Sequence, residues 1–156
     1  MAQLIERVDF LKQRTQKDDM TYPIFSMPIK LYFEDTDALG IIYHANYIKY
    51  FERARTDWLR AADLDHGPLM EMGIGFVIRS ADIEWLSPLT IDAQIEATAQ
   101  VLTLGRSSIT LAQTIVHDGV EVCRATILMV CVSITTKRPV SVPENVRAAF
   151  MKGTAE

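Results

Sequence analysis

Apolar and polar residues alternate along several stretches of the chain, with the period of two that is typical of β-strands. The clearest stretch is 91–102, which should form a strand with one packed face and one wetter face. Its expected inner positions are Ile91, Ala93, Ile95, Ala97, Ala99 and Val101, and its outer positions are Asp92, Gln94, Glu96, Thr98 and Gln100. Further strands are predicted at 29–34, 76–86, 107–116 and 120–134. Asp118-Gly119 is a strong signal for a tight hairpin between the last two.

A helical period replaces this alternation over residues 45–64. Apolar residues recur there three and four positions apart, at Tyr47, Phe51, Ala54, Trp58 and Ala61, and the stripe is widened by Ile48, Tyr50, Leu59 and Ala62. A helix that is apolar over so much of its circumference should be largely enclosed. We expect His66-Gly67-Pro68 to end it, a short turn over 69–75, and a short closing helix over 143–150.

The predicted order is therefore one strand, one long helix and four strands with short connections. Short connections favour antiparallel neighbours, because parallel crossovers need a dozen or more residues. This predicts an α+β fold in which a five-stranded antiparallel sheet curls around the helix. Residues 1–16 also have helical spacing, so we divide the chain into an N-terminal helical extension (1–22), a main domain (23–150) and a C-terminal tail (151–156). A frayed terminus is the alternative for the extension.

Composition narrows the possible functions. The 156 residues carry 16 basic and 20 acidic side chains, for a net charge of −4, which argues against a surface built to bind nucleic acid. Cys123 and Cys131 fall on one predicted strand, about 26 Å apart at the usual rise, which is too far for a disulfide. We expect reduced core cysteines and a cytoplasmic protein. No secretion signal is recognisable, and no apolar run approaches the ~20 residues of a membrane span.

The segment 32–47 is the one that suggests chemistry. Three carboxylates, Glu34, Asp35 and Asp37, lie within four positions, and Gly40 permits a tight bend. The predicted helix start that follows offers unpaired backbone N–H groups and a positive dipole end. Such amides can stabilise an oxyanion, while a carboxylate attacks the carbonyl carbon or takes a proton from water.

The same residues also have a simpler interpretation, in which Asp37 belongs to a turn, Gly40 to a bend and His44 to a helix start. A Ser-His-Asp arrangement is not evident, and neither cysteine lies near this segment. His44 has no second His or Cys at ligand spacing, so a metal site is weakly supported.

The motif Asp37-x-x-Gly40-Ile-Ile-Tyr-His44-x-x-Tyr47 resembles the active-site signature of hotdog-fold acyl-CoA thioesterases of the 4-hydroxybenzoyl-CoA thioesterase type. The resemblance is closest to the Tol-Pal-associated acyl-CoA thioesterase branch. The additional matching residues are Tyr32, the run 34–37, the run 51–55 and the tail 137–143. The resemblance spans about residues 26–150 and implies the hotdog fold, a curved five-stranded antiparallel sheet wrapped around one long central helix. An extra N-terminal helix would precede it.

The resemblance also implies an enzyme that hydrolyses an acyl-CoA thioester to a free acid and CoA. Asp37 matches the catalytic carboxylate, as nucleophile or general base. His44 matches the position whose backbone N–H polarises the thioester carbonyl, and its imidazole is a candidate for orienting substrate or water. Tyr43, Tyr47 and Gly40 are expected to form the substrate site.

No metal or prosthetic group is expected, because CoA arrives with the substrate. The resemblance further implies a homo-oligomer, either a dimer of hotdogs with active sites at the subunit interface or a tetramer. Acyl-carrier protein is a second candidate carrier of the acyl group.

Two other functions stay open at this point. One is another hotdog enzyme, such as a hydroxyacyl-thioester dehydratase. The other is a non-catalytic scaffold that binds acyl-CoA or acyl-carrier protein. Arg53, Arg55 and Arg60 are expected on a solvated or ion-paired helix face, and Lys137 and Arg138 on the surface, with contact to a CoA phosphate as the alternative role for both groups.

Overall fold

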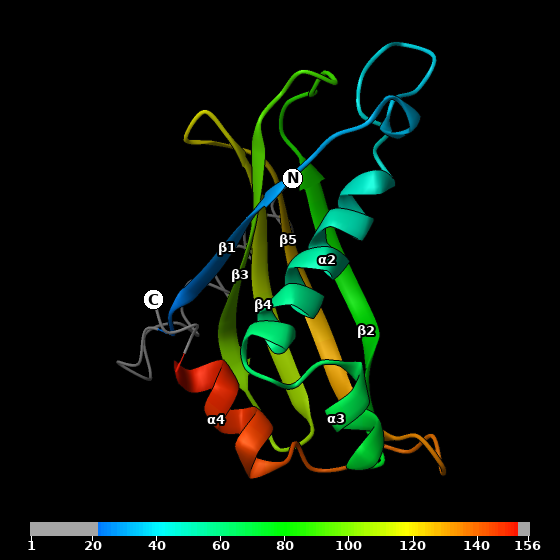
Figure 1. The fold of residues 1–156 in the computed structure, drawn as a ribbon, viewed down its shortest axis with the longest axis vertical. Helices are drawn as coiled ribbons and strands as arrows, with labels where there is room; N and C mark the ends of the chain where they lie inside the picture. Colours follow the sequence, from blue (N-terminus) through cyan, green and yellow to red (C-terminus); the bar gives the residue numbers. More distant parts are fainter. Residues whose placement is uncertain (1–21, 153–156) are drawn as a thin grey trace, which may run out of the picture.

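The computed structural model describes residues 22–152. Its centre is a five-stranded antiparallel sheet in the order β1-β3-β4-β5-β2, with the long helix α2 lying along one face (Figure 1). The elements are β1 (Ile24–Ile29), the 3-10 turn η1 (Phe33–Asp35), α2 (Asn46–Ala61), α3 (His66–Glu71), β2 (Ile74–Trp85), β3 (Ile95–Leu104), β4 (Ser108–His117), β5 (Val120–Ser133) and α4 (Glu144–Lys152). The predicted α+β class and the five antiparallel strands are confirmed. The predicted N-terminal helix lies outside the described residues.

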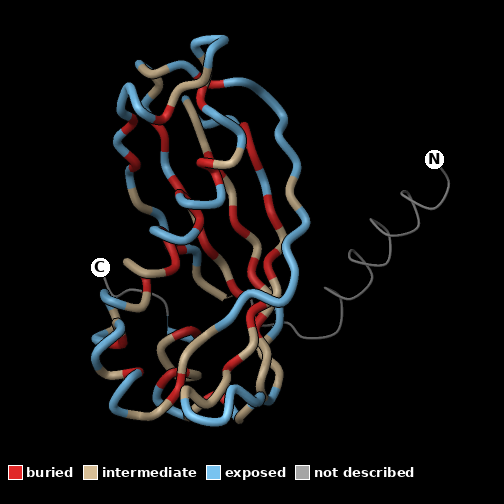
Figure 2. Tube along the Cα trace, turned by 90° about the vertical axis from the view of Figure 1, so that its right-hand side faces the viewer, coloured by how far each residue is buried: buried red, intermediate tan, exposed pale blue. Residues whose placement is uncertain are grey.

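The strand pattern predicted from alternation is present in β3. Ile95, Ala97, Ala99 and Val101 are at most 3% exposed, while the residues between them are more exposed. Figure 2 shows the same alternation of buried and less buried positions along the strands. The predicted hairpin is also confirmed, because β4 and β5 are joined by Asp118-Gly119, whose φ angles of 50° and 76° suit the twist of a two-residue turn.

The core lies between α2 and the sheet. Tyr50, Phe51, Ala54 and Trp58 of α2 are at most 2% exposed. The Trp58 ring stacks on Phe25 of β1 and meets Phe150 of α4 edge-on, at centroid distances of 6.1 and 5.1 Å. These aromatic contacts join the helix to the sheet and to α4, which covers one end of the core (Figure 1).

The enclosure of α2 is one-sided, contrary to the expectation of a largely enclosed helix. Ile48 is 50% exposed and Ala61 is also exposed, so two of the apolar positions counted in the stripe face outward. Helical spacing alone does not show which margin of the stripe meets the sheet, since Tyr50 at one margin is fully buried whereas Ile48 at another is exposed. The fully buried face is the narrower one that contains Tyr47, Phe51 and Trp58.

The first strand is earlier than predicted. β1 covers Ile24–Ile29, whereas the expected strand at 29–34 turns into η1. The cause is Asp35, whose side chain accepts a hydrogen bond from the Tyr32 N–H while its own N–H donates to the Tyr32 carbonyl. Phe33, expected to face inward, is therefore 82% exposed. Pro28 lies within β1, which is tolerated because β1 is an edge strand.

The segment after α2 also differs from its prediction. His66-Gly67-Pro68 begins the short helix α3, where a turn was expected, and β2 begins at Ile74. Proline is acceptable in the first turn of a helix because N–H groups there lack intrahelical acceptors.

The two cysteines confirm their prediction, since both are buried and free on β5. Between residues 22 and 152, the helices are too short or too polar to cross a membrane.

Candidate active site

The loop 36–42 between η1 and α2 is closed by its own backbone. The Asp37 N–H donates to the Ile41 carbonyl at 2.9 Å, and the Gly40 N–H donates to the Asp37 carbonyl at 3.0 Å. Gly40 has a φ of 74°, so it supplies the left-handed conformation expected of a glycine at this bend. The loop thus returns the chain to the start of α2.

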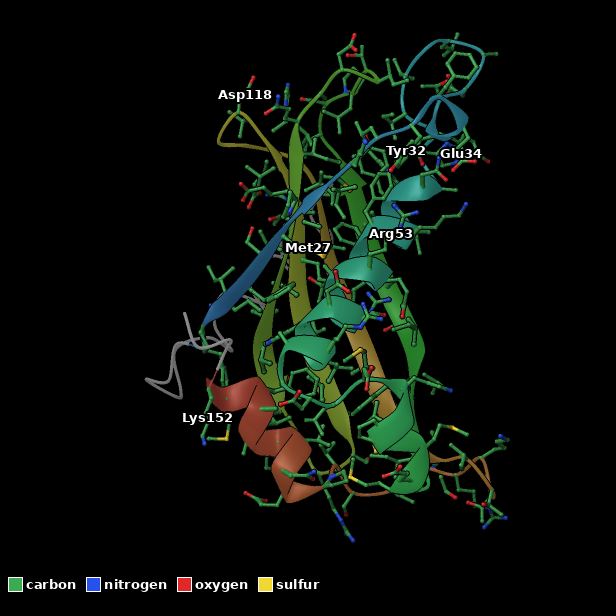
Figure 3. All side chains as sticks on the ribbon, in the orientation of Figure 1. Met27, Tyr32, Glu34, Arg53, Asp118 and Lys152 are labelled. Carbon is green, nitrogen blue, oxygen red and sulfur yellow. The ribbon has the colours of Figure 1, made fainter. Side chains whose placement is uncertain are left out.

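Asp35 forms hydrogen bonds with residues on both sides of this loop. Its backbone carbonyl accepts hydrogen bonds from the Tyr43 N–H and from Asn46 Nδ2, each at 2.9 Å. Its carboxylate accepts the Tyr32 N–H at 2.8 Å. Asp35 and Asn46 are both 7% exposed, so this connection is buried. Figure 3 shows Tyr32 and Glu34 beside the N-terminal end of α2.

The N-terminal end of α2 has open hydrogen-bond donors. Among residues 22–152, the N–H groups of His44 and Ala45 have no acceptor. Ala45 is the N-cap and has no side-chain oxygen to satisfy the first turn, which also has no acidic side chain. Unpaired amides at the positive end of a helix can hold an anion or a developing oxyanion.

An apolar pocket of about 210 Å³ lies beside this helix end. One wall comes from the loop and the helix start, and the other from the end of β2 and the chain after it. The lining residues are Ile41, Ile42, His44, Tyr47, Trp85, Leu86, Ser87 and Pro88. The two walls are joined by hydrogen bonds from Trp85 Nε1 to the His44 carbonyl, at 3.1 Å, and from the Ile42 N–H to the Leu89 carbonyl, at 2.8 Å.

The pocket brings together two of the five predicted site residues, His44 and Tyr47. Asp37, Gly40 and Tyr43 are not among its lining residues. Asp37 is partly buried, and its Oδ1 accepts the Leu39 N–H at 2.8 Å. It is connected to the pocket through Ile41, its partner across the loop. The exposed Tyr43 ring packs against the His44 ring, with their centroids 4.5 Å apart.

Residues 85–88 were missed from the sequence as members of the site. The available signal was the pair Trp85-Leu86 at the end of a predicted strand, just before Ser87-Pro88. Two large apolar residues that remain 45% exposed at such a position are typical of a binding surface, but their exposure is a tertiary property.

Two tyrosines on the buried face of α2 are kept neutral. Burial, with a smaller contribution from Cys123, raises the pKa of Tyr47 to about 12. Tyr47 can therefore donate a hydrogen bond at neutral pH but cannot serve as a base. Burial and the nearby Asp35 carboxylate also raise the pKa of Tyr50. The Tyr50 hydroxyl makes no hydrogen bond of normal geometry within the described part of the chain.

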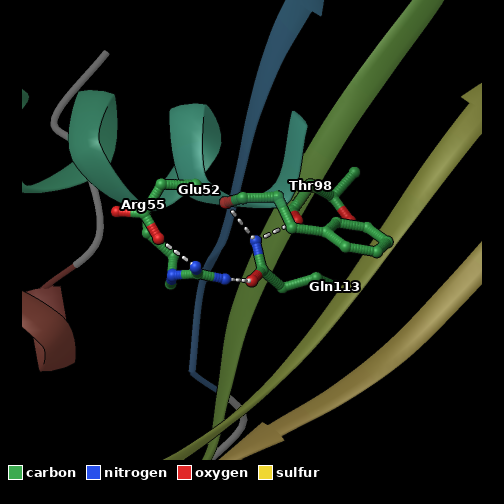
Figure 4. A network of polar contacts seen from close by, with 5 residues as sticks. Glu52, Arg55, Thr98 and Gln113 are labelled. Atoms are coloured by element: carbon green, nitrogen blue, oxygen red, sulfur yellow. Dashed lines mark hydrogen bonds and ion pairs between the residues drawn. The ribbon is translucent and has the colours of Figure 1, made fainter. Parts of the chain in front are cut away.

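A second polar cluster lies under the middle of α2, between the helix and the sheet (Figure 4). Arg55 is ion-paired with Glu52 and donates to Gln113 Oε1 at 2.6 Å. Gln113 Nε2 donates to the carbonyls of Phe51 and Thr98, at 3.1 and 3.3 Å. Arg55 is ion-paired, which is one of the two expected roles, but it is only 7% exposed and therefore does not lie on a solvated face.

The other two arginines lie at the surface as predicted. Arg60 is ion-paired with Asp57, and Arg53 lies over the Tyr50 ring on the outer side of α2 (Figure 3). In residues 22–152, no group of three or more His, Cys, Asp or Glu side chains is placed to hold a metal ion.

A five-stranded antiparallel sheet with a long helix across one face, and a pocket at the open end of that helix, defines a protein of the hotdog class. The chain belongs to the thioesterase-like superfamily, because residues 31–150 match the model of that family. The resemblance found in the motif, including that to the Tol-Pal-associated branch, is thereby confirmed, since the YbgC relatives belong to that branch.

Similar curated proteins include the acyl-CoA thioester hydrolase YbgC of Escherichia coli O6:H1. It is 33% identical over 132 residues, which is 84% of this chain and 98% of the relative. The acyl-CoA thioesterase YbgC of Haemophilus influenzae is 33% identical over 127 residues, covering 81% and 93% of the two chains.

Solved structures give the same fold. A hypothetical protein from Aquifex aeolicus superposes with a TM-score of 0.76 at 28% identity, over 81% of this chain and 98% of that one. A 1,4-dihydroxy-2-naphthoyl-CoA thioesterase from Synechocystis superposes with a TM-score of 0.75 at 17% identity, over 82% and 96%. At that identity the second likeness shows the fold alone.

Proposed function

We propose that this chain hydrolyses acyl-CoA thioesters to a free carboxylic acid and CoA. The observation that carries the proposal is the apolar pocket at the open N-terminal end of α2, where the N–H groups of His44 and Ala45 lack acceptors within residues 22–152. An acyl group fits an apolar pocket, and a thioester carbonyl fits amide donors that become better partners as negative charge develops on its oxygen. The relatives named as acyl-CoA thioester hydrolases support the same activity.

Asp37 is the proposed catalytic carboxylate. As a general base it would take a proton from water while the water oxygen bonds to the carbonyl carbon, and the tetrahedral intermediate would then expel the thiolate of CoA, which recovers the proton. As a nucleophile it would displace the thiolate itself and form an anhydride, which water then hydrolyses. In both routes the His44 N–H polarises the carbonyl. Gly40 shapes the loop that carries Asp37, and Tyr43 and Tyr47 border the acyl group.

We further propose that two copies of the chain pair through the edge strand β2. β2 is 12 residues long, forms one edge of the sheet and leaves Val77 and Ile78 close to half exposed. An exposed edge of this length and character favours pairing with another strand. Because Trp85 ends this strand and lines the pocket together with Leu86, which follows it, such pairing would place the site at the subunit interface. Sedimentation analysis should find a dimer or a tetramer, and a monomer at assay concentrations would contradict this arrangement.

The buried free cysteines agree with a reducing compartment, so we place the protein in the cytoplasm. Fractionation of cells that express a tagged chain tests this placement.

A thiol-release assay across short, long and aromatic acyl-CoAs tests the activity. The matched variants are Asp37→Asn, which keeps the shape but removes the base or nucleophile, and Glu34→Gln, which neutralises an exposed carboxylate three residues away. We expect turnover in the wild type and in Glu34→Gln, and its loss in Asp37→Asn.

Tight acyl-CoA binding without thiol release in the wild type would favour the scaffold function. Conversion of a hydroxyacyl thioester to its enoyl product would favour a dehydratase. The same assay with acyl-carrier protein as the acyl carrier compares the two candidate carriers.

A further inference from the structure

Trp85 contacts the helix end from the opposite wall of the pocket. It is the last residue of β2, and its Nε1–H donates to the His44 carbonyl at 3.1 Å. Its ring also meets the His44 imidazole edge-on, with the centroids 5.9 Å apart and the planes at 88°. One side chain thus lines the pocket and holds the residue at which the carbonyl is expected to bind.

The hydrogen bond acts on His44 at the start of α2. The His44 carbonyl accepts the indole N–H and the His44 imidazole meets the indole ring, so Trp85 restricts this residue through two contacts. The N–H of His44 is the donor proposed to polarise the thioester carbonyl, and it has no acceptor within residues 22–152. Holding His44 therefore limits the movement of a donor that is available to a ligand.

The indole stands on a rigid base. The Trp85 backbone pairs with Cys123 on β5, and the next two N–H groups, of Leu86 and Ser87, both donate to the Val122 carbonyl, at 2.8 and 3.2 Å. The side chain nevertheless remains 45% exposed, which leaves ring surface free for a ligand. A large flat side chain on a fixed backbone is suited to form the wall of a small pocket.

The size of the pocket makes this wall important. Its volume of about 210 Å³ corresponds to roughly seven water molecules at about 30 Å³ each. Replacing an indole by a smaller side chain would therefore enlarge the pocket by a substantial fraction. A wall residue of this kind affects which acyl groups fit, besides affecting how the carbonyl is held.

We propose that Trp85 is a positioning and specificity-determining residue of the proposed thioesterase site. Its N–H holds His44, whose own N–H is proposed to receive the thioester oxygen, and its ring limits the size of the acyl group. This inference rests on the proposed hydrolysis and adds to it a residue contributed by the edge strand.

Two substitutions separate the two roles. Trp85→Phe keeps an aromatic wall but removes the N–H, whereas Trp85→Leu removes both the N–H and much of the wall. Ile24→Ala, an exposed position on β1 at the opposite edge of the sheet that does not line the pocket, is the control. kcat and KM are measured for each with acetyl-, butanoyl-, hexanoyl-, octanoyl- and benzoyl-CoA.

For Trp85→Phe we expect kcat to fall about 3- to 10-fold for every acyl group, with KM within about 2-fold, because the hydrogen bond that holds His44 is lost. For Trp85→Leu we expect the same fall, together with a rise of about 5-fold or more in the kcat/KM ratio of octanoyl- to butanoyl-CoA. Ile24→Ala should match the wild type. An unchanged kcat in Trp85→Phe, or an unchanged acyl preference in Trp85→Leu, would overturn the corresponding role.

A binding measurement makes the inference testable even without turnover. The chain has two tryptophans, and Trp58 is buried in the core. A non-hydrolysable thioether analogue of butanoyl-CoA should therefore change the fluorescence of the wild type, and the change should disappear in Trp85→Phe. Absence of turnover with a Trp85-dependent signal would contradict the proposed hydrolysis but support the contact. Turnover without that signal would contradict the contact alone.

Discussion

Two polar regions along α2 differ in how completely their hydrogen bonds are satisfied. Under the middle of the helix, Arg55 and Gln113 are buried and bonded to each other, to Glu52 and to two backbone carbonyls. At the N-terminal end, the N–H groups of His44 and Ala45 lack acceptors within residues 22–152, and a pocket lined in part by His44 lies beside them. Both regions depend on residues that are far apart in sequence.

The difference indicates what each region is for. A buried polar group costs stability unless it is paired, so a fully paired cluster such as that of Arg55 and Gln113 is suited to fix the helix on the sheet. Donors beside a pocket that find no acceptor among residues 22–152 are available for a ligand. We therefore expect substitutions in the first region to change stability, and substitutions at the second to change activity.

The largest expected effect is that of Asp37→Asn at the open end. Loss of a general base or nucleophile should lower kcat by about 10²- to 10⁴-fold. The free energy of unfolding should change little, because Asn can still accept the Leu39 N–H through its side-chain oxygen. Thiol release measures kcat, and urea denaturation measures the free energy of unfolding. Near wild-type turnover in this variant would move the catalysis to another group.

The opposite result is expected for Gln113→Ala in the paired cluster. The substitution removes one acceptor from the buried Arg55 and leaves two backbone carbonyls without their donor, so we expect a loss of about 2–4 kcal/mol in the free energy of unfolding. kcat per folded molecule should stay within about 2-fold. Gln94→Ala, at an exposed position, is the control and should unfold like the wild type. A selective loss of kcat without loss of stability would contradict the division between the two regions.

The pH dependence of stability provides a smaller test of Tyr47, which lines the pocket. Its pKa is raised from 10.0 to about 12 in the folded chain, so the folded state keeps the phenol proton after the unfolded state has lost it. The stabilisation is complete below pH 10 and is lost as the pH rises from about 10 to about 12, with a slope of at most about 1.4 kcal/mol per pH unit.

Urea denaturation at several pH values should show a shallower alkaline fall for Tyr47→Phe than for the wild type. A fall should remain, because burial also raises the pKa of Cys123 to about 12. The pH profile of kcat between pH 6 and 9 should keep its shape in Tyr47→Phe. If the variant lost the rise or the fall of kcat with pH in that range, Tyr47 would be shown to titrate during catalysis.

The smallest expected effect is that of Tyr50→Phe, between the two regions. The Tyr50 hydroxyl is buried and makes no hydrogen bond of normal geometry within residues 22–152. Removing it should change the free energy of unfolding by less than about 1 kcal/mol, in the stabilising direction. Thermal and urea denaturation measure the change. Destabilisation by more than about 1 kcal/mol would show that the hydroxyl is paired in solution.

The amino-acid sequence by itself determined the features that depend on neighbouring residues. Alternation specified β3, because the side chains of a strand face opposite sides with a period of two. Asp118-Gly119 specified a hairpin, because its residues accept positive φ angles. The segment 37–47 carried enough local chemistry to indicate the family and the helix end at which the pocket lies.

Only the tertiary structure decided the features that join distant segments. Trp85 contacts His44 across 41 positions, and Gln113 contacts Arg55 across 58, which no local period can indicate. The burial of Arg55 has the same origin, since Gln113 on β4 accepts a hydrogen bond from its guanidinium, while Glu52 on the same helix pairs with its charge. The first strand ends early because the Asp35 side chain captures the Tyr32 N–H and turns the chain out of the sheet. Periodicity reports which residues share a face, whereas the packing of elements decides what that face meets.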